Sequence, residues 1–181
     1  MIKNLKKYQG INVLTFFLEN PTLEIHIKEV ARKLKISPAT AKRFCDLYSD
    51  KKIFISEKKS NSIFFKLNNF DNYVTEIKKL YAITKIRDNW QAISDENIRS
   101  VAVYGSYTSG EYSEKSDIDI LILSGKKDID ILFILKFQKK IKKEVNITKI
   151  TYMEWQKLKQ EKDTFANEVL VNHFLIQGEK L

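Results

Sequence analysis

The first 70 residues carry apolar side chains at the spacing of three short helices followed by two strands. This pattern predicts helices over residues 5–18, 27–34 and 37–50 and strands over residues 53–57 and 63–67. Ser37 is a favourable N-cap residue, and Pro38 suits the first turn of the third helix. A tight turn therefore joins the second and third helices, and a polar hairpin with a basic tip joins the two strands.

The remaining residues alternate between helical and extended patterns. Helices are predicted over residues 71–90, 128–143, 151–158 and 164–172, and strands over residues 101–104, 117–123, 145–150 and 174–177. The helix over residues 71–90 has one apolar face, which suits packing on a neighbouring domain or, as a second choice, a contact in a homodimer. We expect an α+β chain with an N-terminal domain over residues 1–70, a connecting helix over 71–92 and a C-terminal domain over 93–181.

The composition is that of a globular protein and excludes several kinds of site. Of the 181 residues 43% are hydrophobic and 30% are charged, and no apolar run has the length of a membrane span. Because the N-terminus also lacks the apolar stretch of a signal peptide, we expect a cytoplasmic protein without a membrane partner. A single cysteine, Cys45, excludes an internal disulfide, and His26 and His173 are too far apart in sequence to suggest a metal site.

The positive charge of the chain is concentrated at its N-terminal end. Residues 1–70 contain 14 Lys and Arg against 6 Asp and Glu, a net charge of +8, whereas residues 71–181 contain 18 against 17, a net charge of +1. A concentrated positive field is typical of modules that bind nucleic acid, because neutralised phosphates supply most of the affinity. A lysine-rich proteome would raise the count everywhere and would not favour one end.

The clearest chemical signal lies in the C-terminal half. Gly105 and Ser106 follow a short buried strand, where a glycine lets the backbone approach a ligand and the first amides of a helix, with the serine hydroxyl, suit a phosphate. Asp117 and Asp119 lie two positions apart on the next predicted strand, so both carboxylates point to one face. Paired carboxylates are ligands that Mg²⁺ uses while it also bridges substrate phosphates.

This segment resembles the minimal nucleotidyltransferases of the DNA polymerase beta superfamily, whose motif is a Gly-Ser turn, a spacer and Asp-x-Asp. The resemblance covers about residues 93–181 and implies a small nucleotidyltransferase domain with a mixed sheet. It implies that Gly105 and Ser106 hold the triphosphate of a nucleoside triphosphate, and that Asp117 and Asp119 bind Mg²⁺ or Mn²⁺ as catalytic residues.

The chain departs from the family at the third carboxylate, which active members carry on the strand after Asp-x-Asp. Asn146 stands at that position, and an amide neither accepts a proton at neutral pH nor offsets the charge of a second metal ion. Glu144 lies two positions earlier on the same face of the strand and is the candidate replacement.

The N-terminal segment, over about residues 5–68, resembles the winged helix-turn-helix domains of prokaryotic transcription regulators. Lys52 stands where such proteins often have glycine. The resemblance implies that the third helix enters the major groove of double-stranded DNA and that the hairpin contacts the backbone. The candidate DNA-binding residues are Pro38, Ala39, Thr40, Lys42 and Arg43 on the helix, with Lys58 and Lys59 on the hairpin. A winged-helix module for protein interaction or dimerisation is the alternative, because folds do not fix functions.

Three functions remain open for the whole chain. In the first, the chain is an active, DNA-binding nucleotidyltransferase that transfers a nucleoside monophosphate to a hydroxyl acceptor. In the second, it is a sensor that binds the nucleotide without turnover and regulates transcription. The third is an antitoxin of a toxin–antitoxin pair, similar to minimal nucleotidyltransferases that modify a partner toxin.

Overall fold

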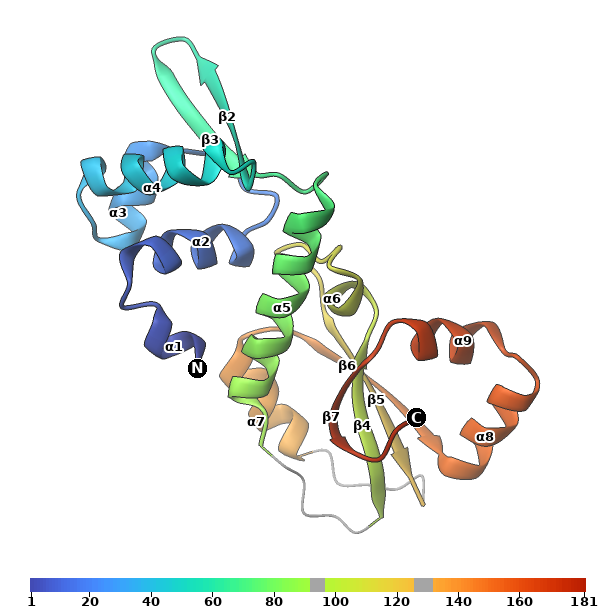
Figure 1. Cartoon of the computed structure of the whole chain (residues 1–181). Coiled ribbons are helices and arrows are strands. Elements are labelled where there is room, and N and C mark those ends of the chain that lie inside the picture. Colours follow the sequence, from blue (N-terminus) through green and yellow to red (C-terminus); the bar gives the residue numbers. More distant parts are fainter. Residues whose placement is uncertain (92–96, 126–131) are drawn as a thin grey trace. The chain divides into compact units, whose positions relative to one another are not determined.

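The chain folds as two compact units (Figure 1), and the computed structural model describes residues 1–91, 97–125 and 132–181, with the side chains of residues 2 and 3 outside this description. The first unit comprises Met1–Tyr81 together with Tyr112–Lys115, and the second comprises Ala82–Glu111 and Ser116–Leu181. The division between them falls inside the long helix α5, Asn72–Asn89.

Four helices open the first unit, and their ends follow from local sequence. They are α1 (Ile2–Leu5), α2 (Gln9–Glu19), α3 (Ile27–Leu34) and α4 (Pro38–Asp50). The side chain of His26 caps α3 by accepting from the amide of Lys28, and the Ser37 hydroxyl caps α4 by accepting from the amide of Thr40. The predicted helices over residues 27–34 and 37–50 are therefore confirmed.

A three-stranded sheet follows the helices. It has the order β1-β3-β2, formed by Ile25–His26, Ser62–Leu67 and Phe54–Lys59 respectively, with both pairs antiparallel. The predicted hairpin is confirmed, whereas the two-residue strand β1 was not predicted because two residues are too few for a period-two pattern. Lys52, which leads into the hairpin, adopts a left-handed conformation with φ 58°, the conformation that favours glycine.

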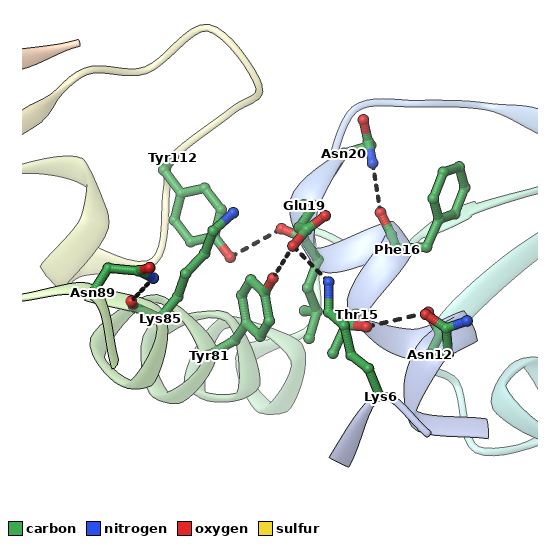
Figure 2. Close-up of polar contacts among 11 residues, drawn as sticks. Lys6, Asn12, Thr15, Phe16, Glu19, Asn20, Tyr81, Lys85, Asn89 and Tyr112 are labelled. Atoms are coloured by element: carbon green, nitrogen blue, oxygen red, sulfur yellow. Dashed lines mark hydrogen bonds and ion pairs between the residues drawn. The ribbon is translucent and has the colours of Figure 1, made fainter. Parts of the chain in front are cut away.

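The core of the first unit is apolar, with polar contacts at its edge. Phe17, Val30, Cys45 and Phe65 are buried in one cluster. Figure 2 shows the edge, where the half-buried carboxylate of Glu19 accepts from Lys6 Nζ at 3.0 Å and from the Tyr81 hydroxyl at 2.5 Å. These bonds satisfy a carboxylate that would otherwise be costly to desolvate.

The segment Tyr112–Lys115 belongs to the first unit although it lies in sequence between the two motifs of the second. The Tyr112 hydroxyl donates to the Leu18 carbonyl at 3.1 Å, and the ammonium of Lys78 lies 5.0 Å from the centre of the Tyr112 ring. The Glu114 carboxylate accepts from both the amide and the hydroxyl of Thr22.

The second unit is built on a four-stranded mixed sheet of order β6-β5-β4-β7. Its strands are β4 (Ile98–Tyr104), β5 (Ile118–Ser124), β6 (Val145–Thr151) and β7 (Phe174–Gly178). Strand β4 pairs antiparallel with both β5 and β7, and β5 pairs parallel with β6. The helices are α6 (Ser106–Ser109), α7 (Leu132–Ile141), α8 (Tyr152–Gln160) and α9 (Thr164–Val171).

Strand β5 is buried on both faces. Ile118, Ile120 and Ile122 are fully buried on one face, while Leu121 on the other packs in a cluster with Trp155 of α8. The four predicted strands of this unit and the helices over residues 151–158 and 164–172 are confirmed, and their ends differ from the prediction by at most three residues. The predicted helix over residues 128–143 begins outside the described residues, and its described part is α7.

Within the described part of the chain, no helix is long and apolar enough to cross a membrane.

Because the Cys45 thiol is buried, the first unit should become less stable at alkaline pH. Burial, with a smaller contribution from Asp46, raises the pKa of the Cys45 thiol to about 12. An unfolded thiol ionises near pH 8.5, so above that pH the unfolded chain loses a proton that the folded chain keeps, and stability falls as the pH rises towards 12. Relative to Cys45→Ala, the wild type should lose about 1.4 kcal/mol of unfolding free energy per pH unit in this window.

Urea unfolding of both proteins from pH 7 to pH 10.5 measures this difference. The alanine variant supplies the control, because lysines and tyrosines titrate alike in both chains. A difference in unfolding free energy that stays constant above pH 9 would contradict the assignment of a buried, neutral thiol.

Candidate active site

The turn after β4 has the geometry expected of a phosphate cradle. Gly105 has φ 73° and ψ −149°, a conformation almost restricted to glycine, and Gly110 ends α6 with φ 81°. The Gly105 carbonyl accepts from the amides of Thr108 and Ser109, so it is occupied within the turn. The amides of Ser106 and Tyr107 are the first of the helix, where amides have no intrahelical acceptor.

Gly105 lies directly against a carboxylate of the second motif. A Cβ atom added to Gly105 would lie 2.6 Å from Asp119 Oδ2, so the carboxylate would have to move. The strand register explains this approach, because Tyr104 of β4 is paired with Asp119 of β5. The sequence-predicted Gly-Ser turn and Asp-x-Asp pair therefore meet at one end of the sheet.

Asp117, Asp119 and Asn146 converge on the other side of this point. Asp119 is paired with Asn146 in the parallel register of β5 and β6. The Asn146 amide Nδ2 donates to Asp119 Oδ1 at 3.1 Å and reaches Asp117 Oδ2 at 3.5 Å. Both carboxylates thus face the side-chain NH2 group of Asn146. Among the described residues, no Lys, Arg or His forms an ion pair with either carboxylate.

These three side chains suit one hard cation. Two carboxylates within reach of a single atom repel each other unless a positive group stands between them, and oxygen ligands are those that Mg²⁺ and Mn²⁺ prefer. Rotation of the Asn146 side chain would present its amide oxygen in place of the nitrogen. Among the described residues, no group of three or more Asp, Glu, His or Cys side chains is arranged so that it could hold a metal ion.

One family model matches this part of the chain. It describes a nucleotidyltransferase domain and covers residues 83–176. The chain belongs to this nucleotidyltransferase family.

Solved structures that are similar to the chain include toxin–antitoxin complexes. A crystal structure of a toxin–antitoxin with AMP-PNP has 19% identity and a TM-score of 0.34 over 56% of this chain and 73% of its own. The toxin–antitoxin mutant MntA–HpeT has 17% identity and a TM-score of 0.34 over 56% and 74%. A candidate nucleotidyltransferase from Sulfolobus solfataricus has 20% identity and a TM-score of 0.31 over 58% and 85%. No curated protein matches the chain.

A cavity of about 310 Å³ opens beside the Gly-Ser turn of the nucleotidyltransferase domain. The residues that line it come from β4, α6 and α9: Tyr104, Gly105, Ser106, Ser109, Glu111, Glu168, Val169 and Asn172. The Thr108 hydroxyl links the two sides, because it lies 2.8 Å from the Gly105 carbonyl and 2.9 Å from the Asn172 carbonyl. Helix α9 is therefore attached to the turn.

Sequence reasoning missed part of this cavity. Glu111 directly follows the motif glycine Gly110 and could have been noticed from its position. Glu168 and Asn172 lie more than 60 residues from the turn and join it only through the packing of α9, for which no local pattern exists.

Tyr107 lies next to the acidic pair and stays neutral. Burial, and secondly the charge of Asp117, raises the pKa of the Tyr107 hydroxyl to about 12. The hydroxyl donates to the Ser116 carbonyl at 3.3 Å. Tyr107 is thus a structural support of the segment that carries Asp117, and its hydroxyl stays protonated near neutral pH.

Glu144 lies apart from the Gly-Ser cavity. Its carbonyl accepts from the Ile118 amide at 2.9 Å, which places it at the start of β6 beside the start of β5. It lines a second, shallow cavity of about 330 Å³ together with Gln138, Lys139, Lys142 and Lys143. Among the sequence-predicted residues, Asp117, Asp119, Gly105 and Asn146 come together, whereas Glu144 borders the group from the side of β6.

The candidate DNA-binding residues lie on two elements of the first unit. Pro38, Ala39 and Thr40 form the first turn of α4, and the basic candidates lie farther along α4 and on β2. Three of these basic side chains already have partners: Lys42 pairs with Asp46 at 2.5 Å, Lys59 pairs with Glu24, and the Arg43 guanidinium lies 4.6 Å from the Phe44 ring centre. The hydrogen bond with Glu24 raises the pKa of Lys59 above its usual range.

A methyl group at Gly105 should disrupt the site. Gly105→Ala places a side chain against Asp119 in a backbone region that costs about 1–3 kcal/mol for other residues. We expect a loss of stability of this order and at least about a tenfold loss of Mg²⁺-dependent nucleotide affinity, equal to about 1.4 kcal/mol. Calorimetric titration and thermal unfolding measure the two effects.

Gly125→Ala is the matched control, because its added Cβ would meet only the Asn97 carbonyl at 3.9 Å. A Gly105→Ala protein that binds nucleotide as tightly as Gly125→Ala would contradict the placement of the triphosphate at this turn.

Proposed function

We propose that the chain transfers a nucleoside monophosphate from a nucleoside triphosphate to a hydroxyl acceptor. The observation that carries the proposal is the position of Asp119 on the central strand β5. Its carboxylate lies against the Gly105 backbone on one side and accepts from Asn146 on the other. Membership in the nucleotidyltransferase family supports the same reaction.

The triphosphate would bind at the first turn of α6, with the amides of Ser106 and Tyr107 and the Ser106 hydroxyl as donors. The described residues that line the adjoining cavity include the carboxylates of Glu111 and Glu168 and neither Lys nor Arg. Close carboxylates repel a triphosphate, so binding requires a divalent cation to balance the charge.

Asp117 and Asp119 would hold Mg²⁺ or Mn²⁺. This ion supplies neutralisation of phosphate charge and a Lewis acid for the transferred phosphoryl group. Asn146 can offer an amide oxygen without a negative charge, so the site holds less charge than one with three carboxylates.

The transfer itself is a displacement at the α-phosphorus. The acceptor oxygen forms a bond to this phosphorus, the bond to the bridging oxygen of the β-phosphate breaks, and pyrophosphate leaves. The hydroxyl proton passes to water or to the Glu144 carboxylate, since the Asn146 amide is no base. The acceptor hydroxyl belongs to a protein, such as a partner toxin, to a nucleic acid or to a small molecule.

The second candidate is a nucleotide sensor without turnover. It is favoured by one observation, the donation of a hydrogen bond from Asn146 to Asp119 at the position of the usual third acid. Nucleotide binding in this version changes the state of the protein and no pyrophosphate is formed.

Substitutions at Asn146 and Asp119 distinguish the two candidates. With labelled nucleoside triphosphate and Mg²⁺, the wild type should release pyrophosphate, Asp119→Asn should abolish release, and Asn146→Asp should raise it at least about tenfold, which corresponds to about 1.4 kcal/mol of transition-state stabilisation. Each variant is also titrated with nucleotide. Tight binding without pyrophosphate from the wild type would reject the enzyme in favour of the sensor.

The Glu144→Gln variant tests the route of the proton. A loss of the acidic limb of the pH–rate profile would assign the proton to Glu144, and an unchanged profile would assign it to water.

We also propose that the first unit binds double-stranded DNA as a winged helix-turn-helix domain. Support comes from its order of elements, with α3 and α4 joined by a tight turn and followed by the β2–β3 hairpin, and from the net charge of +8 over residues 1–70. Arg43 is the candidate for reading a guanine, because its planar guanidinium bonds bidentately, whereas the lysines contact phosphates.

Removal of two basic side chains should weaken this binding in a salt-dependent way. Lys42→Ala/Lys58→Ala should lower the slope of log affinity against log salt by about 1.8, because each phosphate contact contributes about 0.9. Fluorescence anisotropy with a DNA duplex measures the slope. Lys157→Ala/Lys159→Ala on α8 is the charge-matched control, and absence of duplex binding at about 50 mM salt would reject the proposal.

A further inference from the structure

The two sides of the Asp117–Asp119 pair differ in charge. On the side of β4, the described residues that line the Gly-Ser cavity include two glutamates and no cation. On the side of β6, the second cavity is lined by Lys139, Lys142 and Lys143 and by the single acid Glu144. The sheet order places β5 between these two strands, so the carboxylates stand between a cavity without cations and a lysine-rich one.

The lysine-rich cavity lies at the end of the sheet where the acidic pair also lies. The Glu144 carbonyl accepts from the Ile118 amide, one residue after Asp117, and Val145 is paired with Ile118. Glu144 also lies two residues before Asn146 and so shares its side of the strand. The left-handed conformation of Lys142, with φ 56°, turns the chain from α7 into β6 at this point.

The geometry of transfer gives the two sides different roles. In an in-line displacement the acceptor oxygen and the leaving pyrophosphate lie on opposite sides of the phosphorus. If the triphosphate occupies the Gly-Ser turn beside β4, the acceptor approaches from the side of β6. This step rests on the proposed function.

We infer that the acceptor is the terminal hydroxyl of a single-stranded nucleic acid, bound through its phosphates by the lysines of the α7–β6 segment. The exposed lysines Lys136, Lys139 and Lys140 extend this surface along α7, and residues 132–143 contain no Asp or Glu. Lysines repeated at helical turns, about 5 Å apart, suit several phosphates in series more than a single one. A cationic acceptor such as an amino sugar would be repelled.

The test uses the full chain with a fluorescent single-stranded oligonucleotide that ends in a free 3′-hydroxyl, in RNA and DNA versions. The lysine variant is Lys139→Gln/Lys142→Gln/Lys143→Gln. Glutamine is a long, uncharged side chain that should leave the end of α7 intact. Its matched control is Lys157→Gln/Lys159→Gln/Lys162→Gln on and after α8. Anisotropy measures binding, and labelled nucleotide on a denaturing gel measures extension by one residue.

We expect the lysine variant to bind the oligonucleotide at least about tenfold more weakly than the control at 0.15 M salt. The slope against log salt should fall by about 2, because each of three single-strand contacts contributes about 0.7. Extension should fall in parallel, and nucleotide affinity measured alone should stay at the wild-type value. A 3′-phosphorylated oligonucleotide should bind and not be extended.

Equal binding by the lysine and control variants overturns the inference. Label transfer to a protein or amino sugar, with the free-hydroxyl oligonucleotide left unextended, overturns it as well. Failure of the proposed function has a different signature, since nucleotide would then not bind and Asp119→Asn would be without effect. In that case weaker oligonucleotide binding by the lysine variant still supports the surface, and equal binding rejects it.

Discussion

The site depends on the contact between the Gly105 backbone and the Asp119 carboxylate. The pairing of Tyr104 with Asp119 fixes the end of β4 beside the start of β5, and a Cβ at Gly105 would force the Asp119 carboxylate to move. The positive φ of Gly105 turns the chain at this point, so the first amides of α6 follow the turn. The first amides of α6 and the carboxylates of β5 are thereby held at neighbouring strand ends, where their spacing is set by the sheet and not by a flexible loop.

Asn146 determines how much charge this arrangement carries. An aspartate in its place would bring a third carboxylate to Asp117 and Asp119, and only a strong positive charge would hold the three together. The amide instead donates to both carboxylates and lowers their repulsion without a metal ion. The chain therefore has a more stable empty site and a weaker demand for cations than a site with three acids. The proposed chemistry would depend correspondingly more on the charge that the nucleotide and its cation bring.

Local patterns were sufficient for most elements and for the two motifs, because helix caps, strand alternation and the Gly-Ser and Asp-x-Asp spacing are encoded within a few residues. The helix predicted over residues 5–18 is an exception, because α2 begins only at Gln9 and the short helix α1 ends at Leu5. Ser37 and Pro38 determine where α4 begins, and the alternation of Ile118, Ile120 and Ile122 determines the face of β5 that carries the aspartates. Glu168 and Asn172 could not be predicted, because they join the cavity through the packing of a distant helix. Strand β1 and the division inside α5 depend in the same way on tertiary contacts.

The charged side chains around Asp117 and Asp119 suit different substrates on the two sides of β5. In the proposed function, a triphosphate brought to a cavity lined by Glu111 and Glu168 would bind only with a cation, so nucleotide and metal binding would be coupled. The lysines of the β6 side carry their own positive charge, so an anionic acceptor needs no cation to approach. Acceptor binding should therefore depend on salt far more than on the divalent ion, and nucleotide binding should show the reverse dependence. The two dependences belong to opposite sides of one strand, β5, and follow from the order of the sheet.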